Sequence, residues 1–303
     1  MNIPQNIRIK EVGPRDGLQN EQVVLSAGDK IAWIDMLSET GLSYIEITSF
    51  VHPKWIPSLA DALEVAKGIK RKHGVTYAAL VPNAKGLERA LEGDIDEAAV
   101  FMSASETHNM KNINKSIDET LPVLKEVTTE AAKAKRTARA YLSVAFGCPY
   151  EKTVPLDRII RIVDTLFDME ICELSLGDTI GAANPVQVEL MLEALLKRFP
   201  KEKIALHFHD TRGMALANML TAMNMGITAF DGACGGLGGC PYAPGSSGNA
   251  ATDDLIYMCA QMGIETGVDL GKLLAAARWI EEKTEMKLPS RNLQAAKSTG
   301  IIS

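Results

Sequence analysis

Residues 204–231 read IALHFHDTRGMALANMLTAMNMGITAFD. The segment begins with a short β-rich run at residues 204–209, continues with a helical stretch at 213–225, and ends with a second β-rich run at 227–231. Two short strands joined by a helix are typical of a β-α-β unit, in which the strands are parallel. The segment therefore predicts two neighbouring parallel strands with a crossover helix.

The same alternation occupies most of the chain. We expect strands at residues 7–12, 44–48, 75–81, 97–103, 138–146, 171–176, 204–209 and 227–231. We expect helices at residues 26–41, from 58 onward, 83–91, 116–135, 155–168, from 185 onward and 213–225. Two helix starts carry capping signals: Ser26 with Asp29, and Asn184 followed by Pro185. Eight regularly spaced strands favour a closed TIM (β/α)8 barrel over an open doubly wound sheet.

The end of the chain reads as further helices without a low-complexity linker. We therefore expect one catalytic TIM-barrel domain over residues 1–303, with residues 250–303 as a helical C-terminal appendage. A chain of 303 residues with 46% hydrophobic residues can bury a full core.

Charge and cysteine usage exclude several classes of protein. The chain has 32 Lys and Arg against 38 Asp and Glu, a net charge of −6, which argues against nucleic-acid binding but not against a phosphorylated small ligand. No apolar run approaches the roughly 20 residues of a membrane helix, so we expect no membrane partner. The 5 cysteines include no CxxC pair, and the N-terminus lacks the apolar core of a signal peptide. These features predict a cytoplasmic protein, or a protein of a matrix space if a transit peptide has been removed.

His207 and His209 lie two residues apart on the seventh expected strand, so their side chains point to the same side. In a TIM barrel, the C-terminal strand ends form the catalytic face. If this side is the barrel interior, both imidazoles reach that mouth, where nitrogen and oxygen ligands together suit Mg²⁺ or Mn²⁺. The alternative is a hydrogen-bonded polar layer inside the barrel.

Other polar residues gather at strand ends. Arg15 and Asp16 follow the first strand, in a Gly-Pro-Arg-Asp-Gly turn, and Glu46 lies on the second strand. Asp16 could bind the metal or accept a proton, and Arg15, oriented by Glu46, could stabilise a developing enolate oxygen. A surface salt bridge is the alternative interpretation of Arg15 and Asp16. Asp178 ends the sixth strand and is expected in the polar network of the mouth.

Residues 235–242 form an unusually glycine-rich segment after the eighth strand. Three interpretations stay open: a tight turn with a buried cysteine, a phosphate cradle, or a mobile lid. As a lid, the segment would bring the Cys240 thiol to the site as an acid, base or nucleophile.

The residues discussed above also carry a family resemblance, which extends to about residue 292. The chain resembles 3-hydroxy-3-methylglutaryl-CoA lyases, and the segments that carry the resemblance are Val12-Gly-Pro-Arg-Asp-Gly-Leu-Gln-Asn20, Ile45-Glu-Ile-Thr-Ser-Phe50, Leu176-Gly-Asp-Thr-Ile-Gly181, His207-Phe-His-Asp-Thr211, Gly235-Gly-Leu-Gly-Gly-Cys-Pro-Tyr242 and Gly248-Asn249. The segments at residues 12–20 and 235–242 are together highly specific for this family.

The resemblance implies a retro-Claisen cleavage of 3-hydroxy-3-methylglutaryl-CoA to acetoacetate and acetyl-CoA, a reaction of leucine degradation. It implies an acyl-CoA substrate, a homodimer and a divalent cation, Mg²⁺ or Mn²⁺. The implied metal ligands are Asp16, His207, His209 and Asn249. The implied catalytic residues are Arg15, which stabilises the enolate, Glu46, which supports Arg15, Asp16 or His207 as the base, and Cys240 as the proton donor.

Some features limit the resemblance. Ala233 stands where the family often has Ser, Arg212 stands where many members have Tyr, and residues 297–303 lack the regulatory Cys of some animal members. We therefore predict no thiol switch at the C-terminus. Three alternatives stay open: a lyase for a longer 3-substituted glutaryl-CoA, a condensing acyltransferase such as citramalate or isopropylmalate synthase, and a non-enzymatic CoA-thioester-binding protein.

Overall fold

The computed structural model describes residues 2–19, 21, 23–240 and 243–299, with the backbone alone for 240 and 243–247. Eight parallel strands form a closed barrel. They are β1 (Arg8–Glu11), β2 (Tyr44–Ser49), β3 (Thr76–Leu80), β4 (Glu97–Ser103), β5 (Thr137–Ser143), β6 (Glu173–Asp178), β7 (Ile204–Phe208) and β8 (Ala229–Gly232). Pairing of Arg8 on β1 with Ala229 on β8 closes the barrel. The expected TIM barrel is confirmed.

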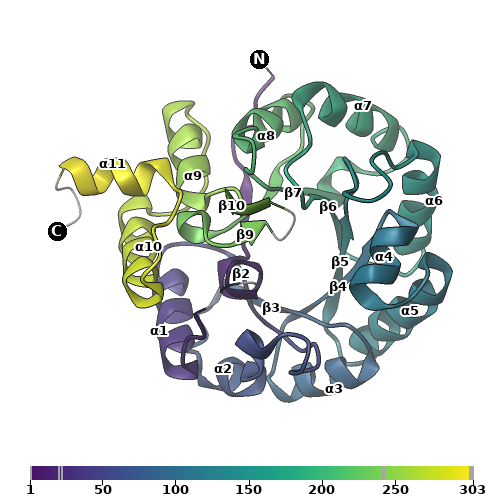
Figure 1. The fold of residues 1–303 in the computed structure, drawn as a ribbon, viewed down its shortest axis with the longest axis horizontal. Coiled ribbons are helices and arrows are strands. Elements are labelled where there is room, and N and C mark those ends of the chain that lie inside the picture. The colour runs from purple at the N-terminus through teal and green to yellow at the C-terminus, as the bar shows by residue number, and fades with distance from the viewer. Residues whose placement is uncertain (1, 20, 22, 241–242, 300–303) are drawn as a thin grey trace.

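A ring of helices surrounds the strands (Figure 1). The helices are α1 (Ala27–Ser38), α2 (Ala62–Gly68), α3 (Ala84–Glu92), α4 (Glu106–Ile113), α5 (Ile117–Lys133), α6 (Leu156–Phe167), α7 (Pro185–Leu195), α8 (Ala215–Asn224), α9 (Thr252–Gln261), α10 (Leu270–Thr284) and α11 (Arg291–Thr299). α9 and α10 lie in this ring between α8 and α1, and α11 projects outward (Figure 1). None of the helices in the described part of the chain is long and apolar enough to cross a membrane.

The capping signals act as the sequence indicates. The Ser26 side chain accepts a hydrogen bond from the backbone N–H of Asp29 and caps α1. The Asn184 side chain accepts one from the N–H of Gln187, and Pro185 is the first residue of α7. Each cap satisfies a backbone donor that the first helical turn leaves free.

The short helix α4 was not predicted. It begins after the Ser105 N-cap, directly beyond β4, and lies at one side of the barrel, in front of the ring and next to α5 (Figure 1). A small antiparallel hairpin, β9 (Gly239–Cys240) and β10 (Ala243–Ser247), lies on the same face after β8. These two insertions shape the entrance to the barrel.

The barrel interior is charged below the mouth. Arg139 on β5 is fully buried and forms ion pairs with Glu173, at 2.8 Å, and with Asp231, at 2.5 Å. Lys10 on β1 pairs with the same Glu173 carboxylate at 3.2 Å. Branched apolar side chains usually fill this position in TIM barrels. Buried charges are costly unless they are paired and hydrogen-bonded, so this layer depends on its complete set of partners.

Candidate metal centre at the mouth of the barrel

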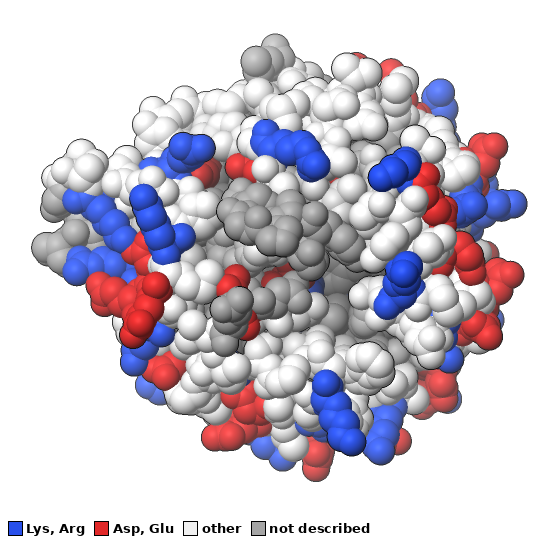
Figure 2. All heavy atoms as spheres, viewed as in Figure 1, with Lys and Arg blue, Asp and Glu red and all other residues white. Residues whose placement is uncertain are grey.

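A cavity of about 1030 Å³ opens at the C-terminal ends of the strands. Arg15, Asp16, His207 and His209 line it, as do residues of α4. Figure 2 shows the hollow in the face that carries α4 and the hairpin. The cavity is therefore at the barrel face where TIM-barrel enzymes carry their active sites.

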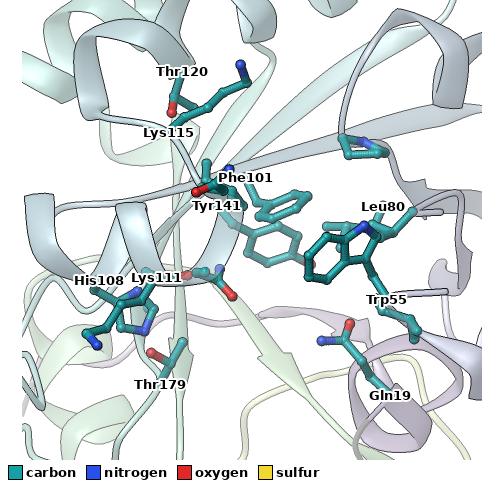
Figure 3. A pocket seen from close by; sticks show the side chains of 18 of the residues that line it. Gln19, Trp55, Leu80, Phe101, His108, Lys111, Lys115, Thr120, Tyr141 and Thr179 are labelled. Carbon is teal, nitrogen blue, oxygen red and sulfur yellow. The ribbon is translucent and has the colours of Figure 1, made fainter. Parts of the chain in front are cut away.

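One wall of the cavity is apolar. Leu80 and Tyr141 pack together, with Phe101 against them, and all three come from the neighbouring strands β3 to β5 (Figure 3). The Trp55 side chain lies beside this wall in Figure 3 and is 79% exposed. Lys111 on α4 lines the same cavity. The cavity thus combines an apolar wall, a basic rim and the charged residues named above.

Asp16, His207 and His209 form a compact cluster of metal-ligand types. One donor atom from each side chain lies within 4.8 Å of the others. The Nε2 atoms of both imidazoles are 4.0 Å from the same Asp16 oxygen, Oδ2. Phe208, between the two histidines, points away and packs against Phe146. The expected same-side placement of the two histidines is confirmed.

The cluster is electrostatically coupled. Burial together with the neighbouring His207 lowers the pKa of His209 to about 3, which leaves this imidazole neutral at pH 7. Burial would raise the pKa of Asp16, but Arg15 and the two histidines hold it below its ordinary value. A neutral imidazole beside an ionised carboxylate is a donor arrangement that suits a divalent cation.

Asn249 adjoins the cluster and contacts one of its members, Asp16. Its backbone forms a β-bridge with His209, and its amide nitrogen donates to Asp16 Oδ2 at 3.0 Å and to the Leu237 carbonyl at 3.1 Å. The Asn249 Oδ1 atom is buried and has no hydrogen-bond partner among the described residues. Unpaired buried oxygens are uncommon in proteins, and this one is a candidate fourth donor beside the Asp16 oxygen and the two imidazole nitrogens.

Arg15 and Asp16 belong to a π-helical turn, Gly13–Gly17, that directly follows β1. The Gly13 position leaves no room for a side chain, because an added Cβ would lie 2.6 Å from Glu11 Oε1. The turn places the Arg15 guanidinium between two carboxylates, in ion pairs with Asp16 and with Glu46, the latter at 2.9 Å. Burial would lower the pKa of Arg15, but these carboxylates raise it, so the side chain stays charged.

Tyr141 is a site residue that sequence reasoning missed. Its hydroxyl donates to Glu46 at 2.8 Å, and the Arg15 guanidinium lies 5.3 Å from its ring centroid. The signal was present in the sequence, because Arg139, Tyr141 and Ser143 alternate as polar residues along one strand. With period-two geometry they share the face that lines the barrel interior.

The Asp178 carboxylate contacts the backbone of the loop that follows β6. Its two carboxylate oxygens accept hydrogen bonds from the backbone N–H groups of Ala182, at 2.9 Å, and Ala183, at 2.8 Å. These contacts fix the loop that follows β6. The pKa of Asp178 is raised, chiefly by burial.

The glycine-rich segment passes close to Asn249 and Gly17. Gly238 has a φ of 111°, and a Cβ there would lie 2.8 Å from the Asn249 amide nitrogen. Glycine is therefore required where the segment crosses Asn249. The backbone of Cys240 pairs with Ala243 in the β9–β10 hairpin, but the Cys240 side chain lies outside the described part of the structure.

Comparison with known proteins adds independent information. The sequence matches the HMGL-like family over residues 6–280. It is 70% identical over 299 residues to the hydroxymethylglutaryl-CoA lyase YngG of Bacillus subtilis (strain 168), covering 99% of this chain and 100% of that protein. It is 48% identical over 292 residues to the mitochondrial hydroxymethylglutaryl-CoA lyase of Bos taurus, covering 96% of this chain and 90% of that protein.

Solved structures agree with the sequence matches. The Bacillus subtilis HMG-CoA lyase superposes with a TM-score of 0.97 at 70% identity, over 98% of this chain and 100% of that chain. An HMG-CoA lyase from Acinetobacter baumannii, solved in complex with coenzyme A and 3-methylmalate, superposes with a TM-score of 0.93 at 38% identity. That match covers 99% of this chain and 98% of that chain.

Proposed function

The chain belongs to the HMGL-like family, and from that premise we propose that it cleaves 3-hydroxy-3-methylglutaryl-CoA to acetoacetate and acetyl-CoA. The observation that carries the proposal is 70% identity, over essentially the full length of both chains, to a hydroxymethylglutaryl-CoA lyase. The cavity residues support the same conclusion, because an ionised Asp16, a charged Arg15 and two histidines meet at one point. The coenzyme A in the Acinetobacter relative supports an acyl-CoA thioester as the substrate.

We propose that Asp16, His207, His209 and Asn249 hold a divalent cation, Mg²⁺ or Mn²⁺. Two observations support the fit: three donor atoms lie within 4.8 Å of one another, and the Asn249 Oδ1 atom is buried without a partner among the described residues. Mixed nitrogen and oxygen donors suit cations of this kind. A bound cation of this class supplies Lewis acidity, which lowers the pKa of a substrate hydroxyl.

Different residues of the chain then accept the proton and stabilise the developing charge. Asp16 or His207 accepts the proton of the C3 hydroxyl, and C3 becomes the ketone carbon of acetoacetate as the C2–C3 bond breaks. The electron pair of that bond passes to the thioester as an enolate, and the Arg15 guanidinium stabilises its oxygen. Glu46 holds Arg15 in place, and Tyr141 donates to the same Glu46 carboxylate. Protonation of C2 then gives acetyl-CoA.

Cys240 is the proposed donor of that last proton. We expect Cys240→Ala to lower kcat by about a hundredfold or more, which is the contribution typical of a general acid. The Kd for Mn²⁺ should stay close to that of the wild type, because the thiol is not a ligand. Steady-state kinetics and Mn²⁺ titration followed by electron paramagnetic resonance measure the two quantities.

Cys259→Ala is the matched control for Cys240→Ala. Cys259 is fully buried on α9 and does not line the cavity, so this variant should keep a kcat close to that of the wild type. If Cys240→Ala abolished Mn²⁺ binding, Cys240 would be a metal ligand, and its role as a proton donor would be wrong.

A product assay separates the lyase from its condensing alternative. Purified protein with 3-hydroxy-3-methylglutaryl-CoA and Mn²⁺ should release acetoacetate and acetyl-CoA in equal amounts. The same protein with acetyl-CoA and a 2-oxo acid should release no free CoA. Release of CoA in the second reaction without cleavage in the first would overturn the proposed function. Chain-extended 3-substituted substrates, assayed in parallel, would reveal a preference for a longer acyl group.

A further inference from the structure

The two nitrogens of the His207 imidazole face different surroundings. Its Nε2 atom faces Asp16, 4.0 Å away, within the cluster of donor atoms. Its Nδ1 atom faces the opposite way, towards the Asp231 carboxylate, and lies 3.4 Å from Oδ2. That distance is slightly longer than an ordinary N–H···O hydrogen bond. The buried Nδ1 atom has no other hydrogen-bond partner among the described residues, and a small movement of the ring would bring it within hydrogen-bond distance of Asp231.

Asp231 is held rigidly at the end of β8, below the cluster. Its Oδ1 atom accepts a hydrogen bond from Arg139 at 2.5 Å, and its Oδ2 atom accepts one from Ser175 at 2.8 Å. The side chains of Asp231 and Arg139 are both fully buried. A carboxylate without a proton can only accept hydrogen bonds. The group that Asp231 presents to His207 is therefore a fixed acceptor.

We propose that Asp231 is a positioning residue that keeps His207 in the tautomer with the proton on Nδ1, so that Nε2 presents its lone pair to the divalent cation. The inference rests on the proposed metal site. A histidine that binds a metal through one nitrogen commonly donates its other N–H to a carboxylate, which fixes both the tautomer and the ring orientation. In this barrel the Arg139 guanidinium and the Ser175 hydroxyl fix the carboxylate in turn.

A purely structural interpretation of Asp231 is the alternative. On that interpretation the carboxylate only neutralises buried Arg139, in the same way as Glu173, which pairs with Arg139 at 2.8 Å. The two carboxylates differ in one respect. Asp231 lies within 3.4 Å of His207, whereas the ion pairs of Glu173 are with Arg8, Lys10 and Arg139. Substitutions of Asp231 and of Glu173 can therefore be compared to separate the two interpretations.

If the proposal holds, the Asp231→Asn substitution should change the tautomer of His207. Arg139 can only donate, so the new amide must turn its oxygen towards Arg139 and its nitrogen towards Ser175 and His207. An amide nitrogen that donates to Nδ1 places the imidazole proton on Nε2, which blocks that nitrogen as a ligand. We expect the Kd for Mn²⁺ to rise about 10- to 100-fold, the usual effect of losing such a partner.

The experiment combines nitrogen NMR with metal titration on the full chain. Metal-free protein labelled with ¹⁵N-histidine has 5 histidines, and a His207→Gln sample assigns the His207 signal. The wild type should show the proton on Nδ1 of His207, and Asp231→Asn should show it on Nε2. The wild-type spectrum tests the proposal even if Asp231→Asn does not fold.

Glu173→Gln is the control variant. We expect it to lower the melting temperature, because it removes one charge from the buried network, and to leave both the His207 tautomer and the Kd for Mn²⁺ unchanged. A wild-type proton on Nε2, or equal Mn²⁺ affinity in the wild type and Asp231→Asn, would overturn the role of Asp231. A wild type that binds no Mn²⁺ would instead overturn the proposed metal site, so the two failures are distinguishable.

Discussion

Asp16→Asn is expected to lower kcat for acetoacetate formation by about a thousandfold or more. Asp16 is central to the cluster, because its Oδ2 atom lies 4.0 Å from the Nε2 atom of each histidine. An amide is nearly isosteric with the carboxylate, but it loses the negative charge that attracts a cation and cannot act as a base. Loss of a general base alone typically costs 10²- to 10⁴-fold in rate, roughly. Weaker metal binding should add to that loss.

Steady-state kinetics and Mn²⁺ titration of Asp16→Asn check this expectation. Asp61→Asn is a suitable control, because Asp61 pairs with Lys30 at 2.7 Å and does not line the active-site cavity. It should keep a kcat close to that of the wild type. Wild-type kcat and wild-type Mn²⁺ affinity in Asp16→Asn would remove Asp16 from both of its proposed roles.

Arg15→Gln is expected to lower kcat by about 10²- to 10³-fold while the Kd for Mn²⁺ changes little. The guanidinium is charged and buried, and Glu46 orients it at 2.9 Å. A fixed donor of this kind stabilises the enolate oxygen in the transition state, and removal of one such donor typically costs about that factor. The effect should fall on kcat rather than on KM, because the interaction forms only as charge develops.

Arg15→Gln will also destabilise the fold, because it leaves buried Glu46 without its cationic partner. Thermal unfolding of each variant should therefore accompany the kinetics. Arg15→Lys keeps the charge but loses the fork that contacts both carboxylates, so it should recover only part of the activity. If Arg15→Gln weakened Mn²⁺ binding as strongly as it lowered kcat, Arg15 would act mainly by positioning Asp16.

The barrel could be predicted because strand and helix patterns alternate along the chain. The expected strand at residues 97–103 has the same bounds as β4, Glu97–Ser103, and most other strands differ by a few residues. The missed helix α4 is short and polar. Its buried Asn109 side chain is hydrogen-bonded to Ser103 on β4 and to Thr120 on α5, and its buried His108 lines the cavity. Such a helix lacks the long apolar period that predicts helices in the outer ring.

The cluster of Asp16, His207 and His209 could be predicted from strand geometry and barrel closure. Period-two geometry places His207 and His209 on one face. Barrel closure through β1 and β8 then brings Asp16 next to residues almost 200 positions later in the sequence. Asp231 was not predicted, because a single polar residue in an apolar strand does not reveal its depth in a barrel. Tyr141 was missed although the polar residues of its strand alternate, because that alternation does not show which of them reaches the mouth. The proposed role of Cys240 stays a prediction from the resemblance.

The most direct test of the account is a metal titration of stripped enzyme. Protein treated with EDTA and then freed of the chelator should release no acetoacetate from 3-hydroxy-3-methylglutaryl-CoA. Activity should return in proportion to added Mn²⁺ and saturate at one ion per chain, because the cluster of Asp16, His207 and His209 offers one site. An Asp16→Asn sample should regain almost no activity under the same titration. Full activity in protein shown by elemental analysis to be free of metal would contradict the account.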